Sequence, residues 1–149
     1  MLHCCIVRKQ YAVRLVVVSG LLLILDLFLA PWYIQTFLIA NIEFTRTALE
    51  PPTGWAAVLA WLSATALLVE VVLSRVAVSG LPEMPLPWIR IQLVQAALTL
   101  VLIVIKFLAT AGHYGWGAWF GLLLAGAFAY GVWAAAGQPR LEDFREWRR

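Results

Sequence analysis

Residues 89–112 form an apolar segment that is long enough to cross a bilayer and yet carries several polar side chains. At about 100° per residue, these side chains fall within one narrow sector of a helix. They are Gln92, Gln95, Thr99, Lys106 and Thr110. A polar stripe on a membrane helix has to face protein or water, because lipid offers it no hydrogen bonds. The segment therefore predicts a helix that forms the inner wall of a bundle.

The composition indicates that the rest of the chain is also embedded in a membrane. Of the 149 residues, 63% are hydrophobic and 13% are charged, and the mean hydropathy is +0.87. These values lie outside the range of soluble globular domains. We predict an all-α integral membrane protein of one domain, a four-transmembrane-helix bundle whose spans cover residues 13–33, 55–76, 89–112 and 116–136.

The three longest segments outside the predicted spans, apart from the amino-terminal residues 1–12, are a connector, a turn and a tail. The connector of residues 34–54 is the longest, a Pro-rich turn covers 77–88, and a charged tail covers 137–149. The connector alternates apolar and polar residues from Ile42 to Arg46. This pattern is too short to decide between short strands and an interfacial helix, so both alternatives stay open.

Lysine and arginine residues are distributed unequally between the two sides of the predicted membrane. One side holds Arg8, Lys9, Arg14, Arg75, Arg90, Arg140, Arg145, Arg148 and Arg149. The other side holds Arg46. Because loops rich in these residues stay in the cytoplasm, we expect both termini, the Pro-rich turn and the tail on the cytoplasmic side of the cytoplasmic (inner) membrane. The connector then faces outward. Basic residues that flank spans also argue against nucleic acid as a partner.

Three ionisable residues lie inside the predicted spans, where each costs about 2.5–3.5 kcal/mol near a helix centre. Asp26 lies about six residues before Trp32, and Lys106 about seven before His113. At about 1.5 Å per residue, the two side chains lie at similar depths in the outer half of the membrane. We therefore predict a buried ion pair between Asp26 and Lys106.

The third ionisable residue, Glu70, lies near the inner end of its span. It is about five residues from Arg75, and Gln95 is about five residues from Arg90. Equal depth predicts a hydrogen bond from Gln95 or Gln92 to Glu70.

The intramembrane polar residues have two interpretations. They either clamp the helices in register or line a path for protons, ions or polar solutes. Thr99 is the one polar residue of the stripe between the Gln92–Gln95 layer and Lys106. We call the apolar stretch between these two polar layers the dry gap. It favours the first interpretation, in which the polar residues hold the helices in register.

The last predicted span has small residues at every fourth position: Gly117, Gly121, Ala125 and Ala129. This spacing lets helix backbones approach closely, either within the bundle or between copies of the chain.

Aromatic residues lie at the ends of the predicted spans. We predict that they are interface anchors at the level of the lipid headgroups: Trp32, Tyr33, Trp55 and Trp116.

The sequence lacks the motifs that enzymes and cofactor-binding proteins usually carry. The two histidines, His3 and His113, lie on opposite sides of the predicted membrane and cannot ligate one haem. The two cysteines, Cys4 and Cys5, are adjacent and form no C-x-x-C motif. We find no catalytic triad, phosphate-binding loop or metal-ligand motif. We therefore expect no catalytic residue, cofactor or metal site, and no enzymatic activity.

Three short motifs carry a family resemblance. The first predicted span ends in Leu27-Phe28-Leu29-Ala30-Pro31-Trp32-Tyr33, the second opens with Gly54-Trp55-Ala56, and the last runs from Tyr114 through Gly131 with many Gly and Ala residues. The chain resembles a group of uncharacterised bacterial four-span membrane proteins whose first span ends in Leu-Phe-Leu-Pro-Trp-Tyr. Ala30 and Asp26 depart from that pattern. The resemblance implies the architecture and no activity.

These observations favour a non-catalytic accessory or assembly subunit of a larger membrane complex, or a homo-oligomer. Its expected partners are the lipid bilayer and other membrane subunits or copies of itself. The alternative is a small ion channel or proton-coupled transporter with a path along the third span.

Overall fold

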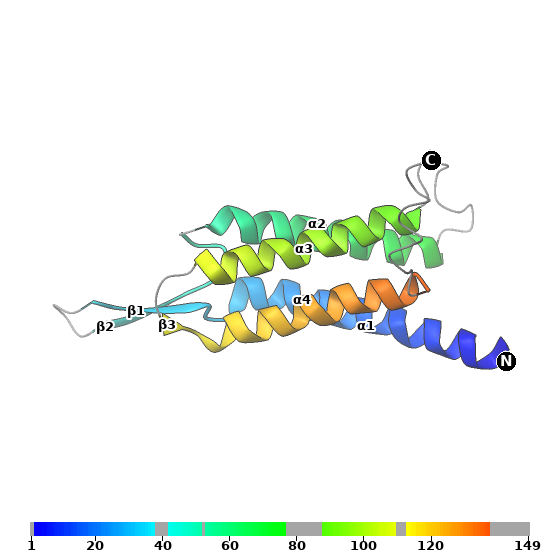
Figure 1. The fold of residues 1–149 in the computed structure, drawn as a ribbon. Helices are drawn as coiled ribbons and strands as arrows, with labels where there is room; N and C mark the ends of the chain where they lie inside the picture. The colour runs from blue at the N-terminus through cyan, green and yellow to red at the C-terminus, as the bar shows by residue number, and fades with distance from the viewer. Residues whose placement is uncertain (1, 38–41, 52, 77–87, 110–112, 138–149) are drawn as a thin grey trace.

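The computed structural model describes residues 2–37, 42–51, 53–76, 88–109 and 113–137. Four long helices lie side by side, and a small sheet extends from one end of the bundle (Figure 1). The helices are α1 (Leu2–Leu29), α2 (Gly54–Val76), α3 (Trp88–Ala109) and α4 (Trp116–Ala135). Each helix contains a segment of 20 to 22 residues that is long and apolar enough to cross a membrane. The prediction of four such helices is therefore confirmed.

One predicted helix boundary needs correction. The first span was expected to reach residue 33, but α1 ends at Leu29, because Pro31 cannot donate to the helix and disfavours a helical conformation at Ala30. The third span was expected to reach residue 112; α3 is described as far as Ala109, and residues 110–112 lie outside the described ones. The Pro-rich turn and the charged tail also lie outside them, except for Trp88 and Gly137.

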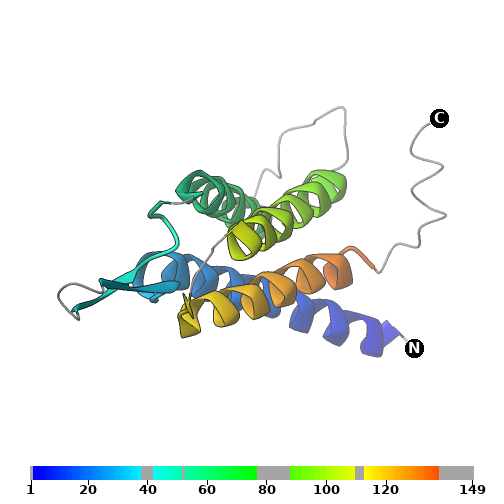
Figure 2. The ribbon, with the colours of Figure 1, turned by 60° about the vertical axis from the view of Figure 1, so that its left-hand side comes forward.

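The helices form a ring in which α1 packs on α4 and α2, and α3 packs on α2 and α4 (Figure 2). Helices α1 and α3 therefore face each other diagonally. One buried apolar cluster lies toward the sheet and contains Leu23, Leu27 and Ile103. A second cluster lies toward the other end and contains Val16 and Phe128.

The sheet has three antiparallel strands in the order β2-β1-β3. They are β1 (Tyr33–Phe37), β2 (Ile42–Arg46) and β3 (His113–Tyr114). Tyr33 pairs with Arg46 on one side and with Tyr114 on the other. Of the connector, residues 34–37 and 42–46 belong to strands, which is one of the two alternatives that its sequence left open. The alternating residues of β2 suit a strand that projects beyond the helices (Figure 1).

The small residues of α4 face α1. A Cβ at Gly117 would lie 2.7 Å from the Ala30 Cβ, and one at Gly121 would lie 2.5 Å from Cζ2 of Trp32. Ala125 is buried and Ala129 is partly buried. This is the packing within the bundle that the four-residue spacing allowed. Because Asp26 and residues 30–32, which follow α1, cover Gly117 and Gly121, these glycines are not available as a contact between copies.

Candidate functional site

Lys106 is fully buried near the sheet end of the bundle. It lies one turn before the end of α3, and its Nζ donates a 2.9 Å hydrogen bond to the backbone carbonyl of Glu50, in the turn between β2 and α2. The ammonium also lies 5.1 Å from the centre of the Tyr33 ring. Hydrogen bonding and the aromatic face both stabilise a buried cation. Lys106 thus joins α3 to the loop that leads into α2.

Tyr33 completes this group from the first strand. Its hydroxyl donates a 2.9 Å hydrogen bond to the Glu50 carbonyl and also contacts the Pro51 carbonyl. Burial raises the pKa of the Tyr33 phenol above its usual value of 10.0, so the hydroxyl stays protonated and can donate. Arg46, whose Nε lies 3.8 Å from Oε2 of Glu50, lies at the more exposed edge of the same group.

Asp26 lies at the same end of the bundle as Lys106, but where α1 packs on α4. It is 5% exposed, and its Oδ2 accepts a 3.1 Å hydrogen bond from Nε1 of Trp32. A Cβ at Gly121 would lie 2.6 Å from the same Oδ2 atom, so the carboxyl group depends on the absence of a side chain there. The second oxygen, Oδ1, is buried without a hydrogen-bond partner.

The structure gives Asp26 and Lys106 different hydrogen-bond partners in place of the predicted ion pair. Asp26 contacts Trp32, and Lys106 contacts the Glu50 carbonyl and the Tyr33 ring. Both residues do lie toward the sheet end of the bundle, but depth along a helix does not determine the direction in which a side chain points. Because α1 and α3 are diagonal in the ring, neighbouring elements supply the partners instead.

The predicted interface anchors divide into two groups. Trp32 is 0% exposed and Tyr33 is 3% exposed, so neither can reach lipid headgroups, and that prediction is wrong for both. The Trp32 ring is covered because it packs against Gly117 and Gly121 of α4, and Tyr33 is covered where it contacts Glu50 and Lys106. Trp55 and Trp116 lie at helix starts and are 56% and 63% exposed, and they stay predicted anchors.

A second polar layer lies nearer the opposite end of the bundle. Nε2 of Gln95 donates a 2.9 Å hydrogen bond to Oε1 of Glu70, which confirms the predicted pairing of α2 with α3. The backbone carbonyl of Gln95 accepts hydrogen bonds from the hydroxyls of Ser63 at 3.1 Å and of Thr99 at 2.9 Å. Oε2 of Glu70 and Oε1 of Gln95 are buried without hydrogen-bond partners.

Gln92 does not join the hydrogen bond to Glu70. It lines a cavity of about 490 Å³ with Ser74 and apolar residues from all four helices, at the end of the bundle away from the sheet. Glu70 and Gln95 lie one turn further along their helices toward the sheet, as expected from a rise of about 1.5 Å per residue. The cavity therefore ends near the second polar layer.

Apolar side chains separate the two polar layers. Leu23, Leu102 and Ile103 are buried between them. Thr99 is also buried there, but its hydroxyl is used by the carbonyl of its own helix. Ser19 and Ser63 are buried at about the level of Thr99, so among the described residues the dry gap is confined to the stretch between Thr99 and Lys106.

Sequence reasoning missed Glu50 and the role of Trp32. Glu50 acts through its backbone carbonyl. Because every residue has this group, the residue type at position 50 does not indicate the role. The indole of Trp32 follows an apolar span, and this context favours the membrane surface over the interior. The preceding Pro31 is the available signal, because it ends the helix and so places Trp32 on non-helical backbone.

The described residues contain no group of three or more His, Cys, Asp or Glu side chains arranged to hold a metal ion. Comparisons with protein-family models, with curated proteins and with solved structures found no match to this chain.

Proposed function

We propose that this chain is a non-catalytic protein of the cytoplasmic membrane that serves as an accessory or assembly subunit of a larger complex. The observation that carries the proposal is the hydrogen bond that Lys106 donates within its own chain. Its buried ammonium binds the Glu50 carbonyl of the same chain and so attaches the sheet to the bundle. A polar interior that holds the fold together, with an apolar layer between its two parts, supports a scaffold better than a conducting path.

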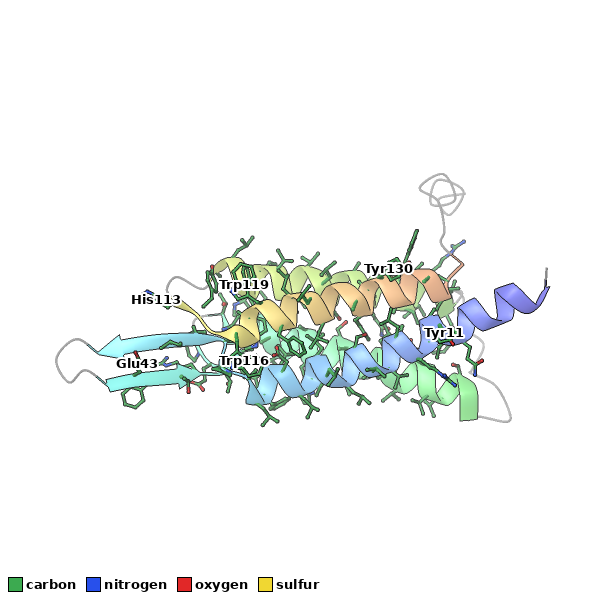
Figure 3. All side chains as sticks on the ribbon, turned by 90° about the horizontal axis from the view of Figure 1, so that it is seen from below. Tyr11, Glu43, His113, Trp116, Trp119 and Tyr130 are labelled. Atoms are coloured by element: carbon green, nitrogen blue, oxygen red, sulfur yellow. The ribbon has the colours of Figure 1, made fainter. Side chains whose placement is uncertain are left out.

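The element best placed for a partner is the sheet. It projects beyond the helices, and Glu43 and His113 lie at that end of the molecule (Figure 3). The strand order leaves β2 at an edge, whose backbone groups can pair with a strand of another protein. Phe44, on β2, is 52% exposed. With both termini in the cytoplasm, as the lysine and arginine distribution favours, this edge faces outward.

Site-specific cross-linking tests the proposal. A photoreactive phenylalanine analogue replaces Phe44 in the full-length chain, which is then cross-linked in native membranes and affinity-purified. The matched control carries the analogue at Leu123, which is 71% exposed on α4 and faces the expected lipid. We expect one partner to cross-link at position 44 and not at 123. A second copy of this chain as that partner would identify a homo-oligomer. Lipid adducts alone at both positions would contradict the proposal.

A specific observation favours the alternative, a small channel or proton-coupled transporter. The cavity of about 490 Å³ ends near Glu70 and Gln95, each of which has a buried oxygen without a hydrogen-bond partner. A carboxyl group at the end of a cavity is a suitable place for a proton or cation to bind. Proton and cation flux in liposomes would support this function if Glu70→Gln abolished it. Absence of flux in the wild-type protein would leave the subunit proposal.

A further inference from the structure

A groove of about 300 Å³ lies between α1 and α4 at the sheet end of the bundle. Its walls are apolar: Leu22, Leu25 and Leu29 of α1, and Trp116 and Phe120 of α4. All five side chains are exposed on the outer surface of the bundle. Figure 3 shows Trp116 beside α1 at this end. If the helices cross a bilayer, lipid chains have direct access to the groove.

Asp26 is the ionisable residue that lines this groove. Trp32 satisfies its Oδ2, whereas Oδ1 is buried without a partner. Lys106, the fully buried cation at the same end, is directed to Glu50 and Tyr33 instead. A buried carboxyl oxygen without a donor is costly in an apolar medium. A donor from outside the chain would remove that cost.

The groove suits a donor of a particular kind. Asp26 lies one turn before the end of α1, which corresponds to the level where headgroups meet acyl chains. A carboxylate attracts an ammonium group, and the aromatic rings of Trp116 and Phe120, with centres 6.3 Å apart, also attract cations. The groove extends over about two helical turns, which is short for a helix lying along it and adequate for a headgroup with the upper part of one acyl chain.

We infer that this groove binds a phospholipid with a primary ammonium headgroup, with the ammonium on the Asp26 carboxyl group and the upper acyl chain against the leucines of α1. The inference rests on the membrane location in the proposed function and not on a subunit role. A primary ammonium supplies both the charge and the N–H donors that Oδ1 lacks, whereas a quaternary ammonium supplies only the charge.

Native mass spectrometry of the full-length protein tests the inference. The protein is released from nanodiscs that contain equal amounts of phosphatidylethanolamine, phosphatidylcholine and phosphatidylglycerol. We expect one phosphatidylethanolamine per chain to be retained, with at least tenfold preference over the other two. Asp26→Asn preserves the shape of the side chain and should abolish the preference.

A second variant keeps the test independent of any loss of folding caused by Asp26→Asn. Leu25→Trp fills the groove from its exposed wall and leaves Asp26 in place, so it should reduce phosphatidylethanolamine retention as strongly. Leu21→Trp is the matched control, because Leu21 is 53% exposed on α1 and does not line the groove. Equal retention of the three lipids, unchanged retention in Leu25→Trp, or a second protein chain cross-linked in the groove would overturn the inference. None of these results depends on whether a partner binds at β2.

Discussion

Lys106 and Glu50 are 56 residues apart in the chain, and the ammonium of the first donates a 2.9 Å hydrogen bond to the backbone carbonyl of the second. This contact joins the end of α3 to the turn before α2. The Tyr33 hydroxyl donates to the same carbonyl, so three separate segments meet at one oxygen atom. The sheet is thereby held against the bundle by a hydrogen-bonded group at the buried end of α3.

Replacing Lys106 with Met should destabilise the fold by about 1.5–3 kcal/mol, because Met keeps the apolar stem and removes a charge-assisted hydrogen bond. Equilibrium unfolding in mixed detergent micelles measures the free energy of unfolding of the variant and of the wild-type protein. Leu108→Met is the control, because Leu108 is on α3 and 72% exposed. Adding Asp26→Leu should not restore stability, since Asp26 and Lys106 have different partners. Restoration by the second change would indicate that the two residues do form an ion pair.

Trp32→Phe should destabilise the fold by about 1–3 kcal/mol, because the Asp26 carboxyl group then loses its donor while staying buried. The same unfolding measurement, applied to Trp32→Phe, Asp26→Leu and the double variant, should show a coupling above about 0.5 kcal/mol. Strictly additive effects would mean that the hydrogen bond contributes nothing to stability.

Glycine positions on α4 should respond very differently to the same substitution. Gly121→Ala should destabilise the fold by about 1–3 kcal/mol, because the new Cβ would lie 2.5 Å from Trp32 Cζ2 and 2.6 Å from Asp26 Oδ2. Gly126→Ala is the matched control, since a Cβ added there would have no neighbouring atom within 4 Å. At that position we expect a gain of up to about 1 kcal/mol from helix propensity. Thermal melting in detergent compares the two, and equal melting temperatures would contradict the close packing of α1 on α4.

Glu70 and Gln95 offer a test of the second polar layer. Glu70→Leu should cost about 1–3 kcal/mol, because the Gln95 amide loses its acceptor inside the bundle. Combining it with Gln95→Leu should recover most of that loss, since removing both partners leaves no unsatisfied amide. The test compares the free energies of unfolding of the two single variants and the double variant. A double variant less stable than both single variants would show that the pair has further polar partners.

The proposed orientation can be checked by cysteine labelling in intact cells. With Cys4 and Cys5 replaced by Ser, Glu43→Cys on the exposed face of β2 should react with a membrane-impermeant maleimide. Gln10→Cys, exposed near the other end of the bundle, should react only after permeabilisation. The reverse pattern would place both termini outside.

Several features could be predicted from residue order because they are local or periodic. Four apolar segments predict four long helices, since a helix satisfies its own backbone wherever lipid surrounds it. The depth of Glu70 and Gln95 predicts their hydrogen bond, because their helices are adjacent in the ring. The spacing of Gly117 and Gly121 predicts a close contact, and the segment that follows α1, with Asp26, supplies it.

Other features depend on how the elements are arranged around one another. Asp26 and Lys106 were expected to pair because their depths match, yet α1 and α3 lie diagonally and each side chain turns to a different neighbour. Trp32 follows an apolar span, as a membrane anchor would, yet it is a buried hydrogen-bond donor, because its side chain packs against α4 and reaches Asp26.

By itself, the sequence determined the number of apolar helices, the approximate depth of each charge and the small-residue face of α4, because these follow from helical periodicity and the rise per residue. Only the tertiary structure decided the partner of each buried charge, the strands of the connector and the groove at Asp26. A hydrogen bond requires both a direction around the helix axis and an acceptor, and at Lys106 that acceptor is the backbone carbonyl of Glu50, which any residue there would provide.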